Sequence, residues 1–167
     1  MQWIDKMKKI NYLNKNEVYD ALIDYFPMQP IPVLPVHMRG LSDPDIVYGF
    51  FSGREWGDIA NDLKLKDHSY ALELGILFIP ESDFFYYIPL YIYASLYNKS
   101  EFWVFESDFI QQYLCPEYRN HDDFLNFILR FTDDQLLILA QFIAYESEIL
   151  KFADATKACR DFWGSYL

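Results

Sequence analysis

The chain has 167 residues, of which 52% are hydrophobic and 20% aromatic, and it carries a formal net charge of -11 at pH 7. This length suits one domain with a sizeable core, and so much apolar surface excludes a disordered chain. The charge is uneven: residues 1–15 hold four lysines against one acid, whereas residues 16–150 hold 22 acids against seven bases, a balance of -15. So acidic a body argues against nucleic-acid binding and favours a basic partner, although solubility alone also explains this charge.

The first helix is expected over residues 14–26, where apolar residues recur at helical spacing. The opposite face of this helix carries Glu17, Asp20 and Asp24, which would form one acidic stripe. Pro27 ends the helix, because proline lacks a backbone donor and restricts the residue before it.

Residues 27–45 contain five prolines and cannot form a regular helix. This segment is too apolar for a linker, so we expect an ordered, extended, proline-rich loop that covers the core. A second helix is expected over residues 54–65. Residues 69–78 fit either a short helix or a buried strand.

An aromatic segment follows over residues 78–98. Its longest charge-free run, residues 84–98, has fifteen residues, fewer than the about twenty that a bilayer span needs. A helix that is apolar on every side but too short to span a membrane is expected at the centre of a helical bundle. Pro80 suits the first turn of this helix, and Pro89 lies deep inside it, where proline predicts a kink.

Four further helices are expected, over residues 101–114, 121–131, 132–150 and 151–167. The third opens with a capping box, in which Thr132 is the cap and Gln135 stands three residues later. Together the patterns predict a mostly α, single domain over residues 1–167. It would be a bundle of about six to seven helices around the aromatic helix.

The sequence contains no recognisable catalytic motif. Acidic residues occur as five close pairs, Asp43/Asp45, Glu81/Asp83, Asp122/Asp123, Asp133/Asp134 and Glu146/Glu148. Three of these pairs stand at expected helix N-termini, where the helix dipole explains them, and solubility explains the rest. We therefore expect no catalytic carboxylate pair.

The other reactive side chains give no stronger signal. The three histidines, His37, His68 and His121, have no cysteine or glutamate at ligand spacing, so no metal and no cofactor are expected. A Cys115–His121 dyad across the proline turn is not favoured. No glycine-flanked serine elbow or phosphate-binding glycine loop occurs. These observations predict a protein that is not an enzyme.

Cellular location is suggested by two features. Cys115 and Cys159 have no metal-binding spacing, and we interpret both as ordinary thiols in a reducing cytoplasm. Residues 1–10 lack the apolar run of a signal peptide.

Residues 78–92, FIPESDFFYYIPLYI, resemble the hallmark of a family of small bacterial proteins described only as a domain of unknown function. That hallmark is a Phe-Leu-Thr-Pro-Glu-Ala-Phe segment running into Tyr-Tyr-Leu-Pro-Ala. The residues in register are Phe78, Pro80, Glu81, Phe84, Tyr86, Tyr87 and Pro89. Ile79 stands where the family has a helix-capping threonine.

The segments LIDYF, GFFSGREWGDIANDL and LRFTDDQLLILAQFIAY are also similar, so the resemblance covers about residues 17–147. It implies an α-helical domain and no catalytic residues.

In its small size and acidity the chain also resembles the immunity proteins of bacterial toxin–immunity pairs, which cover the active site of a toxin that is often a basic nuclease. The leading expectation is therefore a non-catalytic protein that neutralises a cognate basic toxin through an acidic surface. The expected partner-binding residues are Glu17, Asp20 and Asp24, together with Asp122 and Asp123 as a second stripe.

Two alternatives remain open. One is a small enzyme or ligand-binding domain that uses the aromatic helix 81–97 as a pocket wall, and the other is a homodimeric scaffold.

Overall fold

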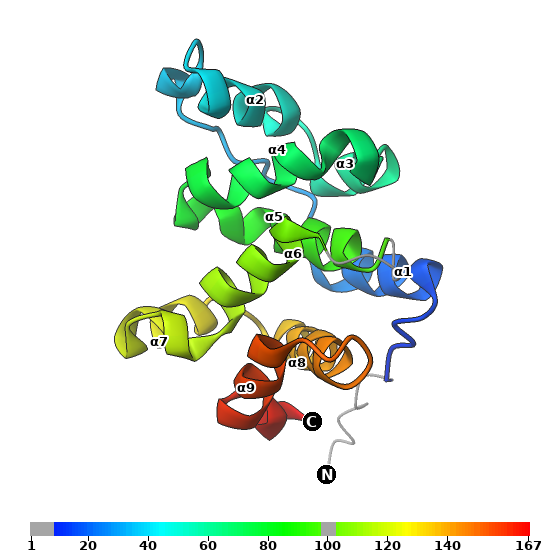
Figure 1. Ribbon diagram of the computed structural model, residues 1–167. Helices are drawn as coiled ribbons and strands as arrows, with labels where there is room; N and C mark the ends of the chain where they lie inside the picture. Colours follow the sequence, from blue (N-terminus) through cyan, green and yellow to red (C-terminus); the bar gives the residue numbers. More distant parts are fainter. Residues whose placement is uncertain (1–8, 98–102) are drawn as a thin grey trace.

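The computed structural model describes residues 9–97 and 103–167, and this part of the chain is helical without a β-strand (Figure 1). Its α-helices are α1 (Lys15–Tyr25), α2 (Ser42–Phe51), α3 (Trp56–Asn61), α4 (Leu65–Phe78), α5 (Glu81–Ser95), α6 (Val104–Phe109), α7 (His121–Ile128), α8 (Asp133–Glu148) and α9 (Ala153–Asp161). Shorter turns are the 3-10 segments η1 (Val36–Met38), η3 (Pro116–Tyr118) and η4 (Trp163–Tyr166) and the π-helical η2 (Ile110–Leu114). The mostly α fold is confirmed, but the described residues form nine α-helices and not about six to seven.

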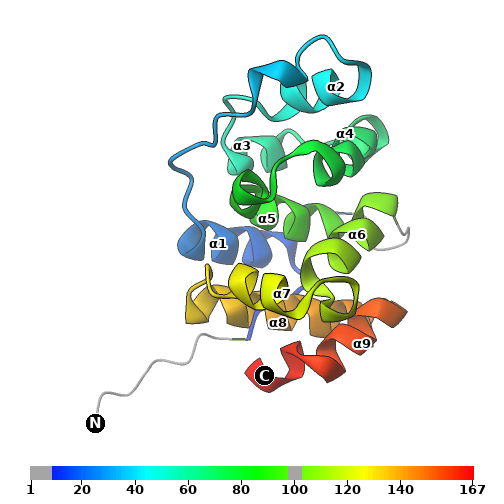
Figure 2. The same cartoon turned by 90° about the vertical axis from the view of Figure 1, so that its left-hand side faces the viewer.

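The helices lie in successive layers from α2 at one end to α9 at the other (Figure 2). Helix α2 packs on α4, and α3 packs on α5. Helix α5 also contacts α1, α4 and α6, whereas α8 packs mainly on α9 and the terminal η4. No helix in the described residues is long and apolar enough to cross a bilayer.

Two sequence-based boundaries were wrong. The loop expected over residues 27–45 is shorter, because α2 already begins at Ser42 with Pro44 in its first turn. The first turn tolerates proline, since its N–H would have no helical partner there. The single helix expected over residues 54–65 is divided between α3 and the first residue of α4. Residues 69–78, for which the sequence allowed a helix or a strand, are helical and belong to α4.

The expected helix over residues 101–114 also differs, as far as the structure describes it. Helix α6 begins at Val104, residues 101 and 102 lie outside the described part, and the last turn is π-helical. The capping box of α8 is present as expected: Thr132 Oγ1 accepts from the backbone N–H of Gln135 at 3.3 Å, and Gln135 Oε1 accepts from that of Thr132 at 3.0 Å.

Helix α5 supplies much of the buried core. Phe84, Tyr87 and Tyr91 have no measurable exposure, and Pro89 is buried inside the helix. The ring of Phe84 stacks on Tyr113 of η2 with centroids 4.0 Å apart. No side chain caps the start of α5, where Pro80 occupies the N-cap position.

Candidate functional site

The residues of the expected acidic stripe, Glu17, Asp20 and Asp24, all lie on α1. Asp20 and Asp24 are exposed, and Glu17 is half-buried and accepts a hydrogen bond from the backbone N–H of Asn11 at 3.0 Å. None of the three carboxylates belongs to an ion pair within the described residues. Among the described residues, no ion pair therefore neutralises the charge of these three side chains.

The opposite face of α1 is held firmly by the core. Val18 and Leu22 are buried. The hydroxyl of Tyr19 accepts from the Asn61 side chain at 2.9 Å on α3, and its ring packs edge-on against Trp56 with centroids 6.4 Å apart. These contacts fix the orientation of the acidic stripe, so its charges are presented on a well-packed helix.

The second expected pair, Asp122 and Asp123, lies exposed in the first turn of α7. Asn120 caps this helix by accepting hydrogen bonds from both of their backbone N–H groups, at 2.9 and 3.4 Å. The carboxylates also favour the positive end of the helix dipole, so helix stability explains their position. Helices α1 and α7 lie on opposite sides of the molecule in Figure 1, so the structure does not bring the two acidic stripes together.

Ion pairs elsewhere on the surface are few. Within the described residues they are Arg54–Asp62, Arg119–Glu81, Lys157–Glu117 and Arg160–Asp161, all partly exposed. Such pairs contribute little to stability. Most of the acids in the described residues belong to none of these pairs.

One groove has a volume of about 790 Å³. It lies between residues 9–13, α8 and the end of the chain, with Tyr12, Leu137, Tyr145 and Leu167 in its walls. A second cavity of about 350 Å³ lies between the proline-rich loop and the start of α5. From α5, only its first turns reach this cavity, through Ser82, Asp83, Phe85 and Tyr86.

Two buried carboxyl groups face each other where α6 meets α8. Glu106 is 1% exposed and Glu146 has no measurable exposure. Burial raises the pKa of both groups, and the Glu106 carboxyl raises the pKa of Glu146 further. Glu106 stands at the third position of α6, where its side chain turns back toward the backbone N–H of Trp103, and this contact opposes the shift.

Cys115 does not have the environment of an activated thiol. It is buried, its thiol contacts the backbone carbonyl of Asp154 at 3.8 Å, and burial raises its pKa. A reactive cysteine needs the opposite shift, toward the thiolate. His121 is exposed at the start of α7 and has no hydrogen bond to this thiol.

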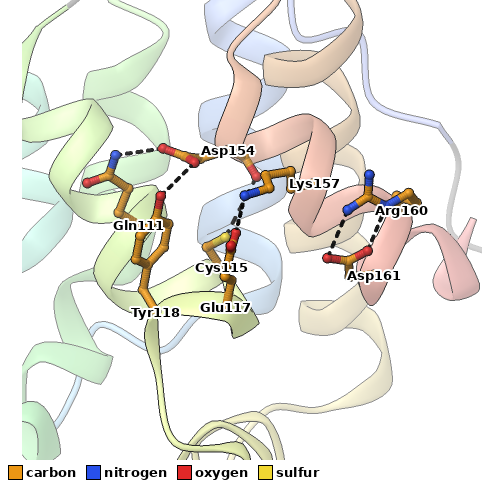
Figure 3. Close-up of polar contacts among 8 residues, drawn as sticks. All are labelled: Gln111, Cys115, Glu117, Tyr118, Asp154, Lys157, Arg160 and Asp161. Carbon is orange, nitrogen blue, oxygen red and sulfur yellow. Dashed lines mark hydrogen bonds and ion pairs between the residues drawn. The ribbon is translucent and has the colours of Figure 1, made fainter.

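The polar groups around Cys115 fasten α9 to η2 and η3 (Figure 3). Asp154 accepts hydrogen bonds from the Gln111 amide at 2.6 Å and from the Tyr118 hydroxyl at 3.0 Å. Lys157 pairs with Glu117 beside them. These contacts join residues of α9 to residues of η2 and η3, so they hold the three segments together.

The histidines do not assemble either. His68 accepts a hydrogen bond through Nδ1 from the backbone N–H of Lys64 at 3.0 Å, and His37 is exposed. Across residues 9–97 and 103–167 no three histidine, cysteine or acidic side chains come together in a way that could hold a metal ion.

No protein-family model, characterised protein or solved structure matches this chain.

Sequence reasoning missed the pairing of Glu106 with Glu146. It grouped Glu146 with Glu148, but Glu146 is buried and Glu148 is exposed. One signal was available, because Glu146 follows Phe142 and Ile143 by four and three residues, on the apolar side of the helix. Nothing in the sequence indicates that Glu106 is its partner, since the two lie in different helices.

Proposed function

We propose that this chain is a cytoplasmic, non-catalytic immunity-type protein that neutralises a basic bacterial toxin by binding it through an acidic surface. The carrying observation is the stripe of Glu17, Asp20 and Asp24 on α1, which has no ion-pair partner among the described residues although its helix is tightly packed. Uncompensated charges on a rigid helix attract an oppositely charged partner over a distance and add little ordering cost on binding.

The α1 stripe is a better candidate than the α7 pair. Asp122 and Asp123 have a local role at a helix N-terminus, whereas Asp20 and Asp24 lie in the middle and last turn of α1, where the helix dipole gives an acid no benefit. Acids that cost stability at their own position are better explained by a partner. We therefore assign toxin contact to α1 and treat α7 as the comparison surface.

The aromatic helix has an indirect role in this proposal. We propose that α5, bent at Pro89, is the rigid centre on which α1 and α3 rest. The alternative, in which α5 is the wall of a ligand pocket, has less support, since only its first turns line a described cavity.

The experiment uses the protein encoded beside this chain in its genome as the candidate toxin. Association rates are measured at low and high salt for the wild type, for Asp20→Lys/Asp24→Lys and for the charge-matched control Asp122→Lys/Asp123→Lys. We expect the α1 variant to associate at least about tenfold more slowly at low salt, the α7 variant to resemble the wild type, and high salt to reduce the difference. Circular dichroism checks that both variants are folded.

A growth assay supplies the functional readout. Co-expression of the wild type should rescue cells from the toxin, and the α1 variant should rescue them less well. Absence of any complex, or absence of rescue, would overturn the immunity function. If a complex forms but its association rate changes neither with salt nor with the α1 substitutions, electrostatic capture by α1 is wrong.

A further inference from the structure

Two buried carboxyl groups, those of Glu106 and Glu146, face each other at the junction of α6 and α8, and this arrangement is unfavourable if both are ionised. Glu106 lies in the first turn of α6 and Glu146 in the last turn of α8, so two distant segments place their carboxyl groups against each other. All four carboxyl oxygens are enclosed, and none accepts a geometrically sound hydrogen bond from a donor in the described residues. A buried polar group without a partner costs about 1–3 kcal/mol, and more if it is charged.

A proton resolves this arrangement. Two ionised carboxylates have only acceptor oxygens, so they repel each other and cannot hydrogen-bond. Once one of them is protonated, its O–H can donate to the other, and the two groups become each other's partner. Burial raises the pKa of both groups, and the charge and hydrogen bonding of Glu106 raise that of Glu146 further. The hydrogen bond with Glu146 lowers the pKa of Glu106, so the shared proton belongs on Glu146 and is donated to Glu106.

The surroundings supply no substitute for the proton. No lysine, arginine or histidine of the described residues pairs with either group. The titratable neighbour is Tyr145, whose buried hydroxyl also has no partner in the described part. Burial raises the pKa of Tyr145, and the two glutamates raise it further. The backbone N–H of Trp103 offers only a weak contact to Glu106.

We infer that Glu106 and Glu146 form a buried proton-binding site that closes α6 onto the end of α8. With a proton held between the two carboxyls the junction is closed, and removal of that proton leaves two like charges in an apolar contact and opens it. This inference does not depend on the proposed function.

Opening would affect a defined region. Helix α6 carries Phe105 and Phe109 into the core. The indole N–H of Trp103, at the N-cap of this helix, is buried and has no hydrogen-bond partner among the described residues. At the other side, the carbonyl of Glu146 accepts from the backbone N–H of Phe152 at 3.0 Å, which links the junction to the start of α9. The first turn of α6 and the connection between α8 and α9 should therefore loosen together.

The sign of the pH effect follows from the direction of the shifts. The folded pair binds a proton more tightly than unfolded glutamates do, so closure is complete below the ordinary glutamate pKa of about 4.3 and weakens as the pH rises through the raised folded pKa. The test compares amide hydrogen exchange of residues 103–114 at about pH 5 and about pH 9, after correction for intrinsic exchange.

We expect exchange of residues 103–114 in the wild type to accelerate at least about tenfold more than intrinsic exchange over this range. The Glu106→Gln/Glu146→Gln variant, whose amides can hydrogen-bond without a titrating proton, should show no such acceleration. Glu148→Gln changes an exposed acid two residues away and should keep the wild-type response. Equal acceleration in the double variant would overturn the inference.

A second measurement needs no variant. Carboxyl carbons of ¹³C-labelled glutamates are titrated in the wild type by NMR. We expect at least one carboxyl to remain protonated at neutral pH and titrate above it. If every glutamate titrates near its ordinary pKa of about 4.3, the proton site does not exist. If Mg²⁺ or Ca²⁺ restores slow exchange at about pH 9, the pair is a cation site and the inference is also wrong.

Discussion

The hydroxyl of Tyr91 on α5 occupies the space on α4 that Gly75 leaves without a side chain. A Cβ atom at Gly75 would stand 2.4 Å from the Tyr91 hydroxyl oxygen and 2.9 Å from the ring of Phe51. The same hydroxyl donates to the carbonyl of Leu72 at 2.5 Å. Glycine inside a helix costs about 1 kcal/mol, and here the close approach of α4 and α5 explains why it is tolerated.

Substitution of Gly75 by alanine should therefore destabilise the protein. We expect Gly75→Ala to lower the free energy of unfolding by about 1–3 kcal/mol, because the added methyl displaces two buried rings. Gly49→Ala is the matched control, since Gly49 also lies in a helix but has open space around it, and this change should stabilise by up to about 1 kcal/mol. Urea unfolding of the two variants gives the comparison, and equal effects would contradict the packing argument.

A second prediction concerns Gln135, which serves two partners at once. Its side-chain oxygen accepts from the N–H of Thr132 at 3.0 Å, and its amide nitrogen donates to the carbonyl of Tyr25 at the end of α1, at 2.8 Å. Gln135→Glu keeps the acceptor and removes the donor, placing a carboxylate against a carbonyl. We expect a loss of about 1–3 kcal/mol.

Thr132→Ala is the control for that prediction, because it removes only the cap and should cost about 1 kcal/mol. Thermal and urea unfolding measure the free energy of unfolding of the variants. If Gln135→Glu leaves it equal to that of the wild type, the hydrogen bond from Gln135 to Tyr25 contributes nothing to stability.

The elements that the sequence predicted well are those set by local rules. The capping box of Thr132 needs only a threonine and a glutamine three residues apart, and α1 needs only helical spacing of apolar residues. The misplaced boundaries have local causes too. Pro44 looked like a loop residue because the first turn of a helix and a loop both accept proline.

What the sequence could not show is pairing across the core. The contact of Gly75 with Tyr91, the bond from Gln135 to Tyr25 and the meeting of Glu106 with Glu146 each join separate helices. Hydrophobic periodicity indicates which face of a helix is buried, but not which residue it meets. A buried acid such as Glu146 therefore looks like any other acid until the fold places a second carboxyl beside it.

A third prediction concerns the two thiols. Burial raises the pKa of both Cys115 and Cys159, so both should react slowly with a thiol reagent at neutral pH in the folded protein and rapidly in urea. Cys115→Ala leaves the hydrogen bonds of Asp154 to Gln111 and Tyr118 in place and should be folded and equally able to bind a partner. A fast-reacting Cys115 in the native state would point to an activated nucleophile instead.

The last prediction concerns alkaline pH. Burial raises the pKa of Tyr12, Tyr87, Tyr91 and Tyr113 above the ordinary value of 10.0, so the folded protein keeps these protons where the unfolded chain has lost them. Their contribution to stability is complete below about pH 10 and declines as the pH rises further, by about 1.4 kcal/mol per unit for each tyrosine. Tyrosinate absorbance and circular dichroism, followed together through an alkaline titration, provide the measurement.

Two phases should appear in that titration. Exposed tyrosines such as Tyr70 and Tyr118 should ionise without loss of helix. The four buried tyrosines named above should ionise only as the helical signal disappears. The pKa of these two exposed residues is itself raised, by Asp43 and Asp154 respectively, so these two should ionise above the range of a free tyrosine. Ionisation of all tyrosines in one step, with the helical signal intact, would mean that the rings of α5 are accessible to solvent and that the packing between α4, α5 and η2 is not as described.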